Sequence, residues 1–219
     1  MTLLTMIVKM GEGLSKTCAI FFLTLLFSLP LGMIVALLRM SKNRIVSGIT
    51  RFFISILRGT PLMLQLLAVT YGPFYLFGAS VARNKLVPII VGFSVNYAAY
   101  FAEIYRGGID SMPAGQYEAA AVLGYSRFQT FMRIILPQVI KRILPSITNE
   151  VITLVKDTSI ARIISMQELI YSGYAFLKGS HGYSGLLWPI FFTGVYYLAF
   201  NGILTLLFGR IEKRLQYFS

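Results

Sequence analysis

Two segments of the chain place polar and charged side chains within otherwise apolar sequence. The first segment carries Asn96, Tyr100 and Glu103, and the second carries Asn149, Glu150, Thr153, Lys156 and Asp157. Spacings of three and four residues put most members of each group on one face of a helix. A charge at membrane depth costs at least about 2.5–3.5 kcal/mol, so such faces turn toward a cavity or a protein partner rather than lipid. The two faces could therefore line a polar passage in which carboxylates, amides and an ammonium group bind a solute.

An alternative gives the same charges a structural role. Glu103 is one helical turn from Arg106, and Lys156 is next to Asp157, so each carboxylate has a candidate ion-pair partner. The amide and phenol groups of the first segment could equally bond a neighbouring helix. The sequence leaves both interpretations open.

The rest of the chain indicates that these faces belong to an all-α integral membrane protein. Hydrophobic residues make up 56% of the 219 residues and charged residues only 13%, against roughly a quarter in soluble domains. The net charge of +12 suits basic loops on the cytoplasmic side of a membrane, and no basic run with interleaved aromatic residues indicates nucleic-acid binding. No linker or repeat divides the chain, so we expect a single domain over residues 1–219.

Five transmembrane helices are predicted, the fourth more polar than the others. They are Thr17–Leu38, about Pro61–Ala79, Leu86–Tyr105, a segment within Val139–Ile164, and Leu186–Phe208. With the N-terminus outside, 13 of the 20 Lys and Arg residues fall in cytoplasmic segments and 7 on the other side. This bias favours an external N-terminus and a cytoplasmic C-terminus.

The longest amphiphilic stretch joins the third and fourth predicted spans, at residues 107–137. Its Gln116–Leu123 segment is typical of a short helix, and Gly124 is expected to end it. Ser126 is a suitable N-cap for a second helix, which Pro137 is expected to end. Two short helices around a glycine would form a compact cytoplasmic knob suited to docking into another protein.

The same loop carries a motif at fixed spacing. Its positions are Glu118, Ala119, Ala120, Gly124, Ile134, Leu136 and Pro137. This pattern resembles the EAA loop of permease subunits of binding-protein-dependent ABC importers. Three further segments, 58–65, 96–106 and 154–159, are similar to the polar amino-acid branch of these permeases, the histidine and glutamine permease-like family. The four segments occur in the order typical of that family, and the resemblance covers roughly Lys16 to Leu215.

The resemblance implies a type I ABC importer permease fold, in which the five spans carry a cytoplasmic coupling-helix loop. Segment Glu118–Gly124 would be the coupling helix that inserts into an ATPase. Such a permease pairs with a second copy, as we expect here, or with a close homologue, and the pair sits on two ATPase subunits. An extracytoplasmic binding protein delivers the solute.

ATP and magnesium are expected in the partner ATPase and not in this chain, which we do not expect to be an enzyme. The segment around Lys16 is not a phosphate-binding loop, because the two glycines that such a loop requires are replaced by Met10 and Ser15. A single cysteine, Cys18, makes a cysteine-based metal site improbable, and no cofactor or metal is expected.

The function implied by the resemblance is ATP-driven import of a polar L-amino acid across a bacterial inner membrane, with a basic amino acid or cystine among the candidates. Carboxylates, amides and helix ends suit a solute that carries both ammonium and carboxylate, and Glu103 or Asp157 could receive the ammonium. The residues expected along the path are Gln65, Asn96, Tyr100, Glu103, Asn149, Thr153, Lys156, Asp157 and Thr158. Import of another small polar solute and self-powered secondary transport are the alternatives.

Overall fold

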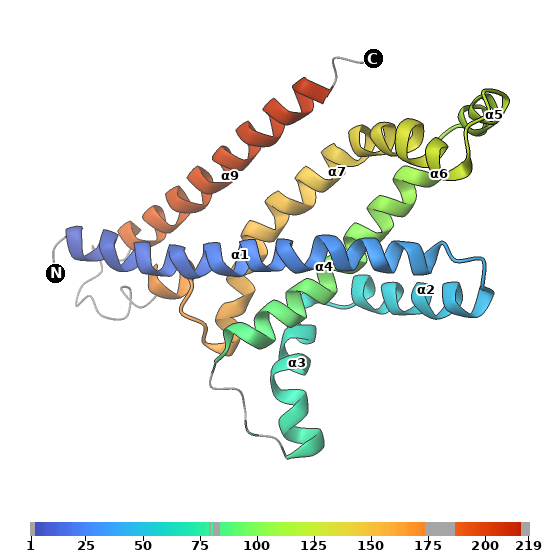
Figure 1. Ribbon diagram of the computed structural model, residues 1–219. Coiled ribbons are helices and arrows are strands. Elements are labelled where there is room, and N and C mark those ends of the chain that lie inside the picture. The colour runs from blue at the N-terminus through green and yellow to red at the C-terminus, as the bar shows by residue number, and fades with distance from the viewer. Residues whose placement is uncertain (1–2, 79, 81–83, 174–186, 216–219) are drawn as a thin grey trace.

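The computed structural model describes residues 3–78, 80, 84–173 and 187–215, and within these it contains helices and no strand (Figure 1). In chain order the elements are α1 (Leu3–Arg39), α2 (Arg44–Gly59), α3 (Leu62–Phe77), α4 (Leu86–Asp110), α5 (Ala114–Val122), α6 (Arg127–Thr130), the π-helical turn η1 (Phe131–Ile135), α7 (Leu136–Asp157), the 3₁₀ segment η2 (Thr158–Ile164) and α9 (Leu187–Leu215). A further helix begins at Leu169 and includes the described residues up to Gly173. The all-helical class predicted from composition is confirmed.

Helix α4 lies at the centre of the packing, and about half of its residues are buried. Helix α1 crosses it closely (Figure 1), and Gly32 permits this approach. A Cβ atom at Gly32 would lie 2.8 Å from the Cβ of Phe101 and 3.1 Å from the carbonyl oxygen of Ala98. Small residues at such crossings allow two membrane helices to pack backbone against backbone. The α1–α4 crossing is therefore a close contact in which the two helix backbones nearly touch.

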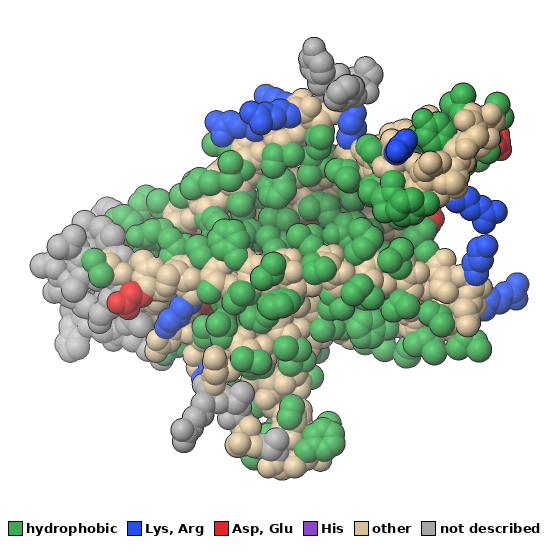
Figure 2. All heavy atoms as spheres, in the orientation of Figure 1, with side chains coloured by type: hydrophobic (Ala, Val, Ile, Leu, Met, Phe, Trp, Pro, Cys, Tyr) green, Lys and Arg blue, Asp and Glu red, His purple; other side chains and the backbone are tan. Residues whose placement is uncertain are grey.

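The outer surface is largely apolar, as expected for a protein that faces lipid. Figure 2 shows hydrophobic side chains along the helices, with Lys and Arg gathered mostly near helix ends. Phe22 and Leu26 of α1, Phe52 of α2 and Leu198 of α9 are all more than half exposed. In water such a surface would carry a large free-energy cost, whereas the hydrocarbon of a bilayer is a solvent that suits it.

Among the residues that the structure describes, three helical segments are long and apolar enough to cross a bilayer, Met10–Arg39, Leu86–Asp110 and Pro189–Leu215. They correspond to the first, third and fifth predicted spans, although the predicted first residue of the fifth, Leu186, lies outside the described residues. Helix α7, which overlaps the segment predicted to contain the fourth span, does not meet this criterion. The count of five therefore stays a prediction.

The second span differs from the prediction. Helix α3 has only 16 residues, about 24 Å of helix, which is too short to cross a hydrocarbon core of about 30 Å. It qualifies only together with α2, and the two are bent by 106° at Gly59–Pro61. The basic segment before Pro61, interpreted from the sequence as cytoplasmic loop, is therefore helical. The predicted end of that span, Ala79, lies outside the described residues.

The helix after Ser126 does not end at Pro137, contrary to the sequence prediction. The chain passes from α6 through η1 directly into α7, with Pro137 in its first turn. Proline lacks an N–H and its ring crowds the carbonyl four residues earlier, so it normally interrupts a helix. Here the π-helical turn absorbs the mismatch, because the Leu136 N–H bonds back to the Phe131 carbonyl.

Candidate functional site

The bend between α2 and α3 is held against α4 by two amide side chains. Asn96 of α4 donates from Nδ2 to the Leu57 carbonyl (3.1 Å) and to Oε1 of Gln65 (3.0 Å). Gln65 donates from Nε2 to the same Leu57 carbonyl (2.8 Å) and to the Thr60 carbonyl (3.1 Å). These carbonyls end α2 and have no partner within the helix, so the amides replace the missing backbone donors. Two residues expected along the path are thus brought together at a helix break.

A second helix break lies next to the first, where α7 becomes the 3₁₀ segment η2. Tyr97, the neighbour of Asn96 on α4, donates its hydroxyl to Oδ2 of Asp157 at 2.7 Å. The fully buried Thr158 begins η2 and donates to the Val155 carbonyl at 2.7 Å. Consecutive residues of α4 therefore contact both interrupted helices. Transporter binding sites are typically built from such discontinuous helices, whose ends present polar backbone groups at membrane depth.

Tyr97 was missed by sequence reasoning, which selected Tyr100. The Tyr97 side chain is only 2% exposed, while Tyr100 lies partly open beneath the Arg58 guanidinium, 5.2 Å from its ring centroid. The two rings are 6.2 Å apart. Its position in the sequence, directly after Asn96, is the signal that could have pointed to Tyr97.

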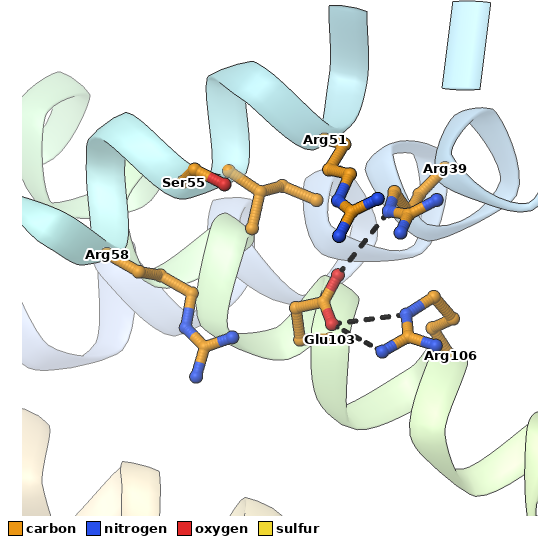
Figure 3. A pocket seen from close by; sticks show the side chains of 7 residues that line it. Arg39, Arg51, Ser55, Arg58, Glu103 and Arg106 are labelled. Carbon is orange, nitrogen blue, oxygen red and sulfur yellow. Dashed lines mark hydrogen bonds and ion pairs between the residues drawn. The ribbon is translucent and has the colours of Figure 1, made fainter. Parts of the chain in front are cut away.

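Glu103 forms the ion pair that was weighed as its structural alternative. Its Oε2 accepts from Nη2 (2.7 Å) and Nε (3.1 Å) of Arg106, and Oε1 lies 3.9 Å from Nε of Arg39 (Figure 3). Arg106 also contacts Asp110 at 2.7 Å. Glu103, Arg39 and Arg106 line a cavity of about 210 Å³ between α1, α2 and α4. The carboxylate is therefore already neutralised in this arrangement.

The polar stripe of α7 lies on an open face. Asn149 and Lys156 are exposed, while Glu150, Thr153 and Asp157 are partly buried. Among the described residues, no ion pair joins Lys156 to a carboxylate, not even to the adjacent Asp157. An exposed ammonium on a helix at membrane depth needs a polar partner or a water-filled cavity. This face is thus unsuited to lipid.

The loop after α4 forms a projecting knob, at the far end of the molecule from the N-terminus (Figure 1). Gly124 ends the first helical segment in the left-handed conformation, with φ of +79°, which glycine adopts without steric cost. Ser126 and Gln129 form a reciprocal capping box at the start of α6, as the Ser126 cap predicted. Glycine and cap together fix the angle between α5 and the helix that follows.

The tip of this knob is apolar and exposed. Val122 is 88% and Leu123 74% exposed, and Glu118 and Ala119 are exposed beside them, whereas Ala120 is buried. At the base, Nη1 of Arg142 on α7 donates to the Ser111 carbonyl at 2.9 Å. An apolar tip anchored to a membrane helix can bury surface in a partner and transmit its movement.

One buried carboxylate was not singled out from the sequence. Glu168 lies after η2, outside the predicted spans, and is fully buried. It accepts hydrogen bonds from the backbone N–H groups of Ile170 and Tyr171, both at 2.7 Å, and so caps the helix at 169–173. Burial raises the pKa of Glu168 above its ordinary value, against the opposing effect of these two donors.

Comparison with known proteins agrees with this architecture. Residues 28–217 match the family of binding-protein-dependent transport system inner membrane components, and the chain belongs to that family. It is 34% identical to the arginine transport system permease protein ArtQ of Bacillus subtilis over 94% of this chain and 91% of that protein. It is 38% identical to the L-cystine transport system permease protein TcyB of Bacillus subtilis, over 73% of this chain and 67% of that protein.

Among solved structures, the fold is similar to the crystal structure of an amino acid ABC transporter with histidines. The TM-score is 0.86 at 28% sequence identity, covering 98% of this chain and 99% of that chain. The chain is therefore a multi-pass inner-membrane permease subunit of an ABC importer, and not an enzyme. In this family the ATPase is a separate subunit, and an extracytoplasmic binding protein supplies the solute.

Proposed function

We propose that this permease forms the path for ATP-driven import of a polar L-amino acid. The observation that carries the proposal is the meeting of two helix breaks at Asn96 and Tyr97, which places the Asp157 carboxylate beside interrupted backbone. Relatives named for arginine, glutamine and cystine transport support an amino acid as the solute. Asp157 receives the substrate ammonium in preference to Glu103, because Glu103 already binds Arg106.

Reconstitution tests this proposal directly. The permease, its ATPase and its binding protein are placed in proteoliposomes, and uptake of labelled arginine, glutamine and cystine is measured with and without ATP. ATP-dependent uptake of at least one of them is expected. Uptake of none, by a system whose ATPase is active, would favour another small polar solute.

The open stripe of α7 points to a second permease subunit. Asn149 and Lys156 are seven residues apart, so they share a face, and both are exposed in the single chain. A second copy placed against this face would enclose the stripe and shield the ammonium from lipid. We therefore propose a homodimer on two ATPase subunits, which bind the ATP and magnesium.

The orientation has its own test, made in a Cys18→Ser background because Cys18 is the only native cysteine. We propose five spans with the N-terminus outside and the C-terminus in the cytoplasm. A cysteine at Glu12, which is exposed near the start of α1, should react with an impermeant thiol reagent in intact cells. A cysteine at Lys213, exposed near the end of α9, should react only after the membrane is opened. Reaction at Lys213 in intact cells would reverse the proposed orientation.

Coupling to the ATPase is proposed for the knob built from Glu118, Ala119, Ala120 and Gly124. The change Gly124→Val forces a branched side chain into a left-handed backbone conformation, at a cost of about 1–3 kcal/mol, and should turn the apolar tip away from its partner. Substrate-stimulated ATPase activity of the assembled complex should fall several-fold.

The matched control for the knob is Gly107→Val, in helical backbone where an added Cβ meets nothing within 4 Å. It should leave the stimulated ATPase activity close to that of the unsubstituted complex. Normal stimulation in an assembled Gly124→Val complex would remove the knob from the coupling mechanism.

A further inference from the structure

The cavity beside Glu103 is lined by an excess of arginine side chains. Arg39 comes from α1, Arg51 and Arg58 come from α2, and Arg106 comes from α4, so the fold brings together charges from three helices. Figure 3 shows the Glu103 carboxylate in contact with Arg39 and Arg106, while Arg51 extends from α2 beside Arg39 and Arg58 extends from the same helix at the other side of the pocket. Four guanidinium groups and one carboxylate leave a formal charge of +3 around a space of about 210 Å³.

The acidic groups nearby are already used. Nε and Nη2 of Arg106 both donate to Oε2 of Glu103, and Nη1 donates to Oδ2 of Asp110. Arg39 reaches the other oxygen of Glu103 at 3.9 Å. In the part of the chain that the structure describes, no carboxylate lies within ion-pair distance of Arg51 or Arg58.

Helix α2 presents these two arginines on a face of their own. Arg51 and Arg58 are seven residues apart, nearly two helical turns, and Ser55 lies between them on the cavity wall. A different face of α2 is apolar and at least 42% exposed, and it consists of Ile45, Ile49, Phe52, Phe53 and Ile56. Helix α2 thus offers hydrocarbon on one side and, on another, two guanidinium groups that have no carboxylate partner among the described residues, although Arg58 also lies over the Tyr100 ring. An anionic ligand would stabilise such charges near a bilayer.

Part of the cavity wall is held in place without any ligand. Arg39 donates from Nη1 to the Ser47 hydroxyl at 3.0 Å, and that hydroxyl donates to the Arg39 carbonyl at 2.7 Å. Arg106 is fixed by its two carboxylate partners. Arginine forks held in this way bind planar or tetrahedral oxyanions with little loss of side-chain entropy.

We propose that this cavity binds a phosphate group, supplied either by the headgroup of an anionic phospholipid or by free phosphate. Guanidinium forks match phosphate oxygens bidentately, and the space is several times the roughly 30 Å³ that a water molecule occupies in the liquid. The lipid source rests on the proposed orientation, which puts the C-terminal ends of α1 and α4 at the cytoplasmic face, where basic pockets between helices bind anionic headgroups. The site itself is independent of which solute is imported.

The test uses the full-length permease, purified without its ATPase, and two phosphate probes. Binding of inorganic phosphate is measured by calorimetric titration of the permease, first in a neutral detergent and then in nanodiscs of phosphatidylcholine that contain the permease. Retention of phosphatidylglycerol from mixed nanodiscs is counted by native mass spectrometry. Whichever of the two probes binds, inorganic phosphate or phosphatidylglycerol, the substitution Arg51→Gln should weaken its binding ten- to hundredfold, because it removes one charge-assisted contact.

Two further variants guard against misfolding as an explanation. Arg44→Gln removes the same charge from the same face of α2, two turns earlier and away from the cavity, and should leave phosphate binding unchanged. Glu103→Gln removes the competing carboxylate and should tighten phosphate binding, a change opposite to that expected from general loss of structure.

The outcomes separate the sources and can overturn the proposal. Retention of phosphatidylglycerol that depends on Arg51 identifies a lipid site, and an Arg51-dependent response to inorganic phosphate in phosphatidylcholine identifies a free-phosphate site. Equal binding by the unsubstituted and Arg51→Gln proteins, or equal loss in Arg44→Gln, refutes the proposal. Displacement of the probe by free amino acids also refutes it, since the cavity would then belong to the amino-acid path. Because no readout is transport, a failed import assay leaves this result intact.

Discussion

Replacing Gly32 with valine should destabilise the permease by about 3 kcal/mol, an effect at the upper end of the range for overpacking. Even a single Cβ at this position would press on the Phe101 side chain at 2.8 Å and on the backbone of Ala98 at 3.1 Å. Backbone of a buried helix cannot rotate away as a side-chain end can, so α1 must move off α4. The loss of stability is measured by thermal unfolding of the purified protein in detergent, monitored through the helical circular dichroism signal.

The control for this prediction is Gly202→Val in α9, a second glycine within an apolar span. A Cβ at Gly202 meets nothing within 4 Å, so valine should be accommodated with little change in unfolding temperature. If Gly32→Val unfolds at the same temperature as Gly202→Val, the close α1–α4 approach is not a determinant of stability.

Much of the fold could be predicted because its signals are local. The long apolar runs of α1 and α4 predict spans by length alone, and Gly124 and Ser126 mark helix ends through their own backbone and side-chain chemistry. Helix α2 could not be predicted in this way. Its arginines lower the mean hydropathy and resemble a cytoplasmic loop, although they lie on one face of a helix whose other sides are apolar.

The candidate site was predictable in its residue types but not in its contacts. The bond between Gln65 and Asn96 joins residues 31 apart and depends on a 106° bend that no periodicity encodes. Helical spacing places Tyr100 near the face of Asn96 and turns Tyr97 about 100° away from it, so the polar pattern alone favours Tyr100. In the structure α4 has neighbours on several sides, and the face that carries Tyr97 meets α7 at Asp157.

The change Asp157→Asn should weaken binding of the imported amino acid ten- to hundredfold, with little effect on folding. Asparagine is nearly isosteric and can still accept the Tyr97 hydroxyl hydrogen bond, but it cannot neutralise an ammonium group. Loss of one charge-assisted hydrogen bond costs about 1.5–3 kcal/mol, which corresponds to that range in affinity. Occupancy of the permease complex by labelled amino acid and thermal unfolding should be measured on the same preparations.

Two companion variants show whether the charge itself is responsible. Asp110→Asn removes an exposed carboxylate at the end of α4 and should leave amino-acid occupancy unchanged. Tyr97→Phe keeps the Asp157 charge but removes its hydrogen-bond donor, so it should disturb the position of the carboxylate and weaken occupancy less than Asp157→Asn does. Reduced stability with full occupancy in Asp157→Asn would instead assign Asp157 to joining α7 and α4, and the ammonium would have to be bound elsewhere. Glu150, half-buried two turns earlier on α7 and without an ion pair among the described residues, is then the carboxylate to test next.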